Sequence, residues 1–182
     1  MGREPDRPAQ PSDPASEPAS DPAGDPADQP DRGAALRSLL GVTTAVCRGE
    51  MDDASWLVDD ATTCGLADLI VAVSPVATRA LLRVAGGAAH VGDPAMLTGE
   101  LGLACCGRFP EGAGSIGSLC LLAATGRIDP WDPRLVFALG FSEDVPVWGA
   151  VAATWFATER AAHEHGRDPV VVAQRICLQL AA

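Results

Sequence analysis

The stretch that decides the fold is VPVWGAVAATWFATERAAHEHG, residues 145–166. Its two tryptophans, Trp148 and Trp155, lie seven residues apart and therefore share one face of a helix, and Phe156 follows the second of them. No charged residue appears before Glu159, and a helix that is apolar on all sides is buried either centrally in its own domain or by a partner. We therefore expect Trp148, Trp155 and Phe156 to lie in the core or at a protein interface.

Both ends of this helix are marked in the sequence. Ser142 or Asp144 can cap the first turn, where Pro146 is also favourable because its missing N–H is not needed there. Gly166 can adopt the left-handed conformation that ends a helix. The sequence therefore predicts one long helix from about residue 145 to residue 165.

Four pairs of a capping residue and a proline predict the starts of further helices. Serine and aspartate are good N-caps, and proline suits the first helical position. The pairs Ser74-Pro75, Asp93-Pro94, Asp132-Pro133 and Asp168-Pro169 therefore predict helices at about residues 75–85, 94–106, 133–140 and 169–181.

Apolar residues at helical spacing predict two more helices, at about residues 33–48 and 51–61, and a further helix is expected at about residues 115–125. Residues 66–73 and 170–172 are rich in β-branched side chains, but they do not alternate with polar residues and have no hairpin partner, so we expect no strand there. The predicted fold class is all-α, with eight or nine helices in one compact domain over residues 33–182.

Residues 1–32 differ from the rest of the chain. They hold eight of the fifteen prolines and no apolar side chain larger than alanine except Met1, and residues 13–28 repeat an acid-Pro-Ala motif with a period of four. Proline at every fourth position is incompatible with a helix, and so little apolar surface cannot offset the entropy of ordering the chain. We expect residues 1–32 to form a disordered, acidic, Pro/Ala/Asp-rich arm that serves as a linker or as a recognition segment.

The chain has 24 acidic and 13 basic residues, which gives a net charge of −11. Because nucleic-acid binding relies on clusters of basic side chains, which this sequence lacks, we expect no nucleic-acid partner. The longest stretches without charge have 15 and 14 residues, fewer than the roughly 20 that span a membrane, so we expect no membrane insertion. No apolar leader follows Met1, which favours a cytoplasmic protein, and the absence of Lys, Tyr and Asn predicts a GC-rich bacterial source.

The glycines Gly112, Gly114 and Gly117 have the G-x-G-x-x-G spacing of dinucleotide-binding loops, in which glycines let a pyrophosphate approach the start of a helix. That fingerprint also requires a preceding strand and a βαβ alternation, and the sequence predicts neither. We therefore expect these glycines to allow close helix approach, and we expect no bound cofactor.

Six cysteines are present without a C-x-x-C pair, and we expect them to be free, mostly buried thiols. The adjacent Cys105 and Cys106 are the best candidates for a reactive thiol, because Arg108 is near enough to lower a cysteine pKa. Successive residues on a helix point about 100° apart, so at least one of the two is expected to face the core.

Acidic pairs and histidines could in principle hold a metal ion. The pairs Asp52-Asp53 and Asp59-Asp60 would lie about 10 Å apart along a helix, which is too far to share one ion. Glu159 and His163 lie one helical turn apart, but two ligands do not make a site. We therefore expect no metal site and assign no catalytic residues.

These observations favour a non-enzymatic helical protein that associates with itself or with another protein, with Trp148, Trp155 and Phe156 as core or interface residues. The alternative is an enzyme or sensor that binds a small molecule in a pocket near one loop. The residues of that alternative site are Cys105, Cys106, Gly112, Gly114 and Gly117.

Overall fold

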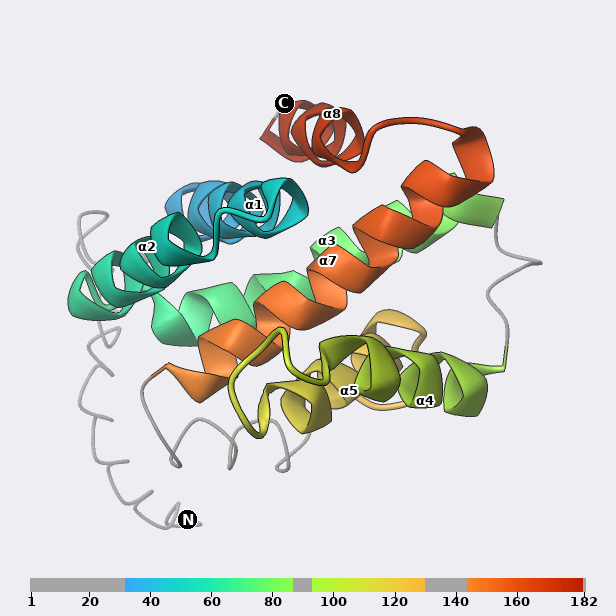
Figure 1. Ribbon diagram of the computed structural model, residues 1–182, viewed down its shortest axis with the longest axis horizontal. Helices are drawn as coiled ribbons and strands as arrows, with labels where there is room; N and C mark the ends of the chain where they lie inside the picture. Colours follow the sequence, from blue (N-terminus) through green and yellow to red (C-terminus); the bar gives the residue numbers. More distant parts are fainter. Residues whose placement is uncertain (1–31, 87–92, 130–143, 182) are drawn as a thin grey trace, which may run out of the picture.

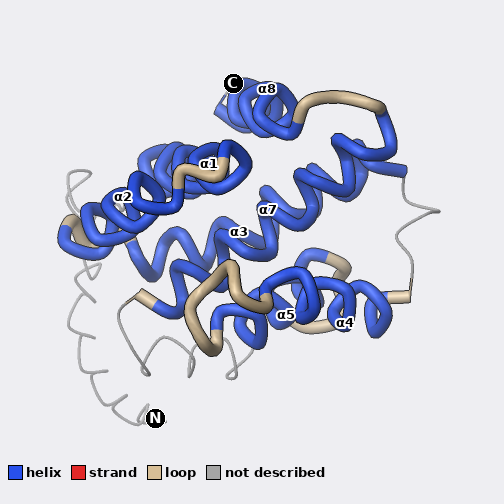
Figure 2. Tube along the Cα trace, in the orientation of Figure 1, coloured by secondary structure: helices blue, strands red, loops and turns tan. Residues whose placement is uncertain are grey.

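The computed structural model describes residues 32–86, 93–129 and 144–181 (Figure 1). These residues form only helices and no strand, as Figure 2 shows, so the predicted all-α class is confirmed. The seven helices are α1 (Arg32–Arg48), α2 (Met51–Thr63), α3 (Ala67–Gly86), α4 (Pro94–Cys105), α5 (Ala113–Ala124), α7 (Val145–His165) and α8 (Pro169–Ala181). The predicted helix at 133–140 and the acidic arm up to residue 31 lie outside the described residues. Helix α1 begins at Arg32, one residue before the predicted start of the domain.

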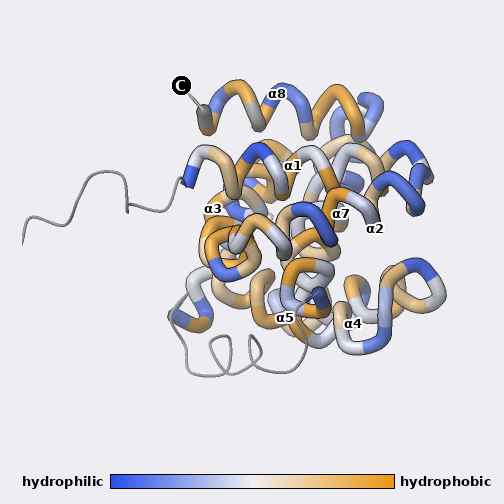
Figure 3. Tube along the Cα trace, turned by 90° about the vertical axis from the view of Figure 1, so that its left-hand side faces the viewer, coloured by the Kyte–Doolittle hydropathy of each residue, from blue (hydrophilic) through white to orange (hydrophobic). Residues whose placement is uncertain are grey.

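The helices are arranged in layers around a central pair. Helices α3 and α7 lie side by side through the middle of the molecule, and their contact is the most extensive between any two described helices. Helices α1, α2 and α8 cover one side of this pair, and α4 and α5 cover the other (Figure 3). Because α7 is covered on both sides, a helix without a polar face can be buried by its own chain.

The long helix predicted from residue 145 to residue 165 is confirmed as α7, and its C-terminal end has the predicted form. Gly166 adopts a left-handed conformation with a φ of 57°. The N–H groups of Gly166 and Arg167 donate to the carbonyl oxygens of His163 and Ala162, which satisfies two acceptors of the last turn.

The N-terminal end of α7 differs from the prediction. Asp144 lies directly before the helix, but its carboxylate makes no capping hydrogen bond. Instead, its Oδ1 accepts a hydrogen bond from the Thr62 hydroxyl of α2 at 3.3 Å. The predicted cap by Asp144 is therefore wrong, because a tertiary contact takes up the carboxylate, and the other predicted cap, Ser142, lies outside the described residues. Pro146 lies in the first turn, as expected.

The start of helix α3 also differs from the prediction. Ser74-Pro75 does not begin a helix, because α3 starts at Ala67 and contains Pro75 in its interior. Proline has no N–H to donate to the carbonyl four residues before it, here that of Val71. The Ser74 hydroxyl donates to this Val71 carbonyl at 3.2 Å and so replaces the missing donor. Other predicted starts are confirmed, since Asp93 accepts from the N–H of Ala95 and Asp168 from that of Val170.

Candidate functional site

An open pocket of about 450 Å³ lies where the loop of residues 106–112 joins α4 to α5. Four residues of the alternative small-molecule site line this pocket: Cys105, Cys106, Gly112 and Gly114. The fifth residue, Gly117, lies on α5 where that helix meets α7 and does not line the pocket. The structure therefore brings together most of the site that was predicted near this loop.

The first two glycines of the G-x-G-x-x-G pattern have structural roles. Gly112 has a φ of 90°, a left-handed conformation that side chains rarely adopt, and a Cβ there would lie 3.3 Å from Cγ1 of Val145. A Cβ at Gly114 would lie 3.4 Å from Cβ of Cys105, so this glycine lets α5 pack closely on α4. Both positions are explained by backbone conformation and packing alone.

The third glycine lies at the crossing of α5 and α7. A Cβ at Gly117 would lie only 3.0 Å from the carbonyl oxygen of Gly149, and a Cβ at Gly149 would lie 2.5 Å from Cβ of Ile116. The two helices therefore approach through paired glycines. The prediction of close helix approach identified Gly117 but missed Gly149, because nothing in the sequence shows which glycine on another helix is its partner.

Cys105 and Cys106 differ sharply in environment. Cys105 is buried, and burial raises the pKa of its thiol to about 11, with Cys106 adding to the increase and Arg108 partly opposing it. Arg108 therefore acts in the predicted direction but is outweighed by desolvation. Cys106 is exposed, and its thiol donates to the Gly102 carbonyl. A buried thiol with a raised pKa is protonated at neutral pH and is a poor nucleophile.

The tryptophans of α7 lie in the hydrophobic core of the chain. The ring of Phe109 packs against both indoles, with centroids 6.0 Å from Trp148 and 5.4 Å from Trp155. The guanidinium carbon of Arg108 lies 4.6 Å from the centroid of the Trp155 ring. Phe156 belongs to the same buried cluster. The chain itself covers these aromatic side chains, so of the two predicted environments they occupy the core.

The acidic residues and histidines that were considered as metal ligands do not come together in one site. Both aspartate pairs on α2 are exposed, and so are His163 and His165. Over the described ranges, no three His, Cys, Asp or Glu side chains are close enough to hold a metal ion. The five cysteines whose side chains are described are all free thiols.

The outer face of α4 is a surface that sequence reasoning missed. Leu97, Leu101 and Cys105 point inward and are buried, whereas Met96 and Leu103 are exposed. Leu103 has 79% of its surface exposed, the largest fraction for any large apolar side chain among the described residues. The signal in the sequence is that α4 is apolar on both faces, but only the fold decides which face neighbours cover.

Helix α3 is the one described helix with the length and hydropathy of a membrane-spanning segment, and half of that segment is buried inside the molecule. The core helix of a water-soluble domain has the same properties.

Comparison of the chain with protein-family models, curated proteins and solved structures found no significant match.

Proposed function

We propose that this protein is a non-enzymatic, cytoplasmic helical module that associates with a second copy of itself through the outer face of α4. The observation that carries the proposal is the exposure of Met96 and Leu103 on one side of a single helix. A contiguous patch of exposed apolar side chains is typical of protein contact sites. The net charge of −11 favours a protein partner over nucleic acid.

One glycine on the exposed side of α4 supports this proposal. A Cβ at Gly99 would meet no atom within 4 Å, in contrast to the glycines of the α5–α7 crossing, whereas Gly102 lines the pocket between α4 and α5. Glycine inside a helix costs about 1 kcal/mol relative to alanine. Packing within one chain does not explain that cost here. A second helix lying across α4 would use the space, since small residues let two helix backbones approach closely.

The single charged side chain of α4 is paired within the chain. Glu100 is the one charged residue of this helix, and its carboxylate lies 2.8 Å from the guanidinium of Arg160 on α7. The ion pair draws the Glu100 side chain toward α7. Glu100 stays 47% exposed in this pair, so a second copy that buries the apolar surface of Met96 and Leu103 would have the Glu100–Arg160 ion pair beside it.

The proposal is tested by sedimentation velocity on the full chain and on two matched variants. Leu103→Gln changes the proposed contact, and Leu178→Gln changes a leucine on α8 that is 75% exposed. We expect the wild type and Leu178→Gln to sediment as dimers and Leu103→Gln as a folded monomer with an unchanged circular dichroism spectrum. A monomeric wild type, or equal dissociation by both variants, would contradict self-association through α4.

A second candidate is the small-molecule site at the α4–α5 loop, because an open pocket is present there. Cys106 is its exposed thiol. This candidate predicts that a soluble ligand protects Cys106 from alkylation, whereas the α4 contact predicts protection that depends on protein concentration. Alkylation rates measured by mass spectrometry at low and high protein concentration separate the two.

A further inference from the structure

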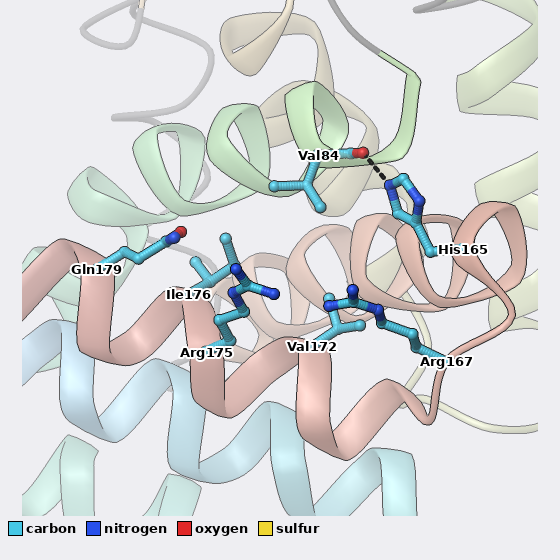
Figure 4. A pocket seen from close by; sticks show the side chains of 7 residues that line it. All are labelled: Val84, His165, Arg167, Val172, Arg175, Ile176 and Gln179. Carbon is cyan, nitrogen blue, oxygen red and sulfur yellow. Dashed lines mark hydrogen bonds between the residues drawn. The ribbon is translucent and has the colours of Figure 1, made fainter.

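A smaller pocket, of about 240 Å³, lies on the opposite side of the molecule from α4, where the C-terminal ends of α3 and α7 meet α8 (Figure 4). Its apolar wall is made by Val84 of α3 and by Val172 and Ile176 of α8. Val172 and Ile176 are buried, while Val84 lies at the rim. The pocket is therefore part of the folded core at its base and open to solvent at its mouth.

Local structure fixes the position of the polar groups around this pocket. The left-handed Gly166 ends α7 and turns the chain, so that Arg167 stands between α7 and α8. Arg175 and Gln179 follow on α8 one turn apart, and both line the pocket. His165 closes one end, because its Nε2 is hydrogen-bonded to the carbonyl oxygen of Val84.

Two of the residues that line this pocket, Arg167 and Arg175, are arginines. In Figure 4 the side chain of Arg167 extends from one end of the pocket toward that of Arg175, and Gln179 lies beyond Arg175 at the other end. Within the described residues, neither guanidinium forms an ion pair, although Arg48 and Arg160 each pair with a glutamate. Asp168, which follows Arg167 in the sequence, accepts a hydrogen bond from the N–H of Val170 and forms no ion pair with either arginine within the described ranges.

Arg167 and Arg175 are both exposed, so water screens the repulsion between their like charges, and an anion bound between the two guanidinium groups reduces it further. Guanidinium groups bind carboxylates through paired, charge-assisted hydrogen bonds. The amide of Gln179 adds a neutral donor and acceptor beside Arg175. Apart from His165 at one end, the rest of the wall is aliphatic, which favours an anion that has an apolar part.

We infer that this pocket binds a small organic carboxylate. Its carboxylate group lies between Arg167 and Arg175, and its short aliphatic body lies against Val172 and Ile176. This inference goes beyond the proposed association through α4 and is independent of it, because α4 and α8 lie on opposite sides of the central α3–α7 pair.

The test uses isovalerate as a branched carboxylate probe, its neutral amide isovaleramide, and inorganic phosphate. Titrations of the full chain are followed by NMR at the arginine Nε–Hε groups and at the Ile176 methyl groups. We expect a saturable shift of these signals with isovalerate. Isovaleramide and phosphate should each bind at least about tenfold more weakly, because the first lacks the charge and the second lacks the apolar body.

Variants complete the test. Arg167→Gln and Arg175→Gln should each weaken isovalerate binding by about tenfold or more, since each removes one charge-assisted contact. Arg127→Gln is the matched control: it removes the same charge from an exposed arginine that does not line the pocket, and it should leave binding unchanged. The inference is overturned if isovalerate causes no saturable shift, if isovaleramide or phosphate binds equally well, or if the control variant weakens binding as much as the pocket variants.

Discussion

Trp155 joins the loop between α4 and α5 to the central helix. Its ring contacts Phe109 and the Arg108 guanidinium, and its Nε1 donates to Oε1 of Glu159 at 3.2 Å. Only 6% of its surface is exposed. The chain has four tryptophans and four phenylalanines in all, so a single buried indole contributes a large share of the aromatic packing.

Replacing Trp155 by alanine should therefore lower the free energy of unfolding by about 3–5 kcal/mol. Urea unfolding followed by circular dichroism measures this without using the indole as the probe. Trp56→Ala is the control, because Trp56 is 66% exposed and its loss should change stability by no more than about 0.5 kcal/mol. If Trp155→Ala leaves the urea midpoint in place but dissociates the protein, Trp155 lies at an interface and not in the core.

Burial also raises the pKa of two cysteine thiols, those of Cys120 and Cys47. Burial raises the pKa of Cys120 from 9.0 to about 11, partly opposed by a hydrogen bond with Ser74, and burial raises that of Cys47 to about 12. In the unfolded chain these thiols ionise near their ordinary pKa, whereas in the folded chain they stay protonated. The folded state therefore binds more protons, and stability falls as the pH rises from 9 toward 11.

This dependence is unusually easy to isolate, because the chain has neither lysine nor tyrosine and arginine keeps its proton. We expect the urea midpoint to fall between pH 9 and pH 11, and Cys120→Ala to make the fall less steep. Cys64→Ala is the matched control, since it removes a thiol from an exposed position. A wild-type midpoint that stays constant over this pH range would show that the thiols are not held protonated by the fold.

At the scale of the elements, the crossing of α5 and α7 sets how closely two layers pack. A methyl group at Gly149 would overlap Ile116, so Gly149→Ala should destabilise the protein by about 1–3 kcal/mol. Gly41 in α1 has open space where a Cβ would lie, and Gly41→Ala should instead stabilise by up to about 1 kcal/mol. Thermal unfolding of both variants distinguishes the two positions, and equal shifts in one direction would contradict the close crossing.

The helices could be predicted from the sequence where a local signal controls them. Asp93 and Asp168 start helices through hydrogen bonds within their own first turns, and Gly166 ends α7 through its own backbone conformation. The start of α3 was predicted wrongly, because the Ser74 hydroxyl replaces the donor that Pro75 lacks. A proline pair alone does not distinguish this arrangement from a helix start.

The candidate sites could likewise be predicted only where their residues are close together in the sequence. The pocket near the α4–α5 loop was predictable because Cys105, Cys106, Gly112 and Gly114 are close in sequence. The outer face of α4 was not, because the sequence does not show which of two apolar faces α5 and α7 cover. The pocket between Arg167 and Arg175 was also not predictable, since it forms only where three helices meet.

At the scale of the whole molecule, the layered arrangement separates two surfaces. The central α3–α7 pair and the helices that cover it bury the tryptophans, and α4 stands at the edge of one covering layer. Its apolar outer residues therefore add nothing to the core of the chain that carries them. Their place in the fold is explained if a second copy covers them.

Amide hydrogen exchange of the wild-type protein at low and high concentration tests this claim most directly, because it needs no substitution and reports on each helix. Self-association through α4 predicts that exchange in Pro94–Cys105 slows as the concentration rises, while exchange in Pro169–Ala181 stays the same. Exchange in α4 that does not depend on concentration, or slowing confined to α8, would contradict it.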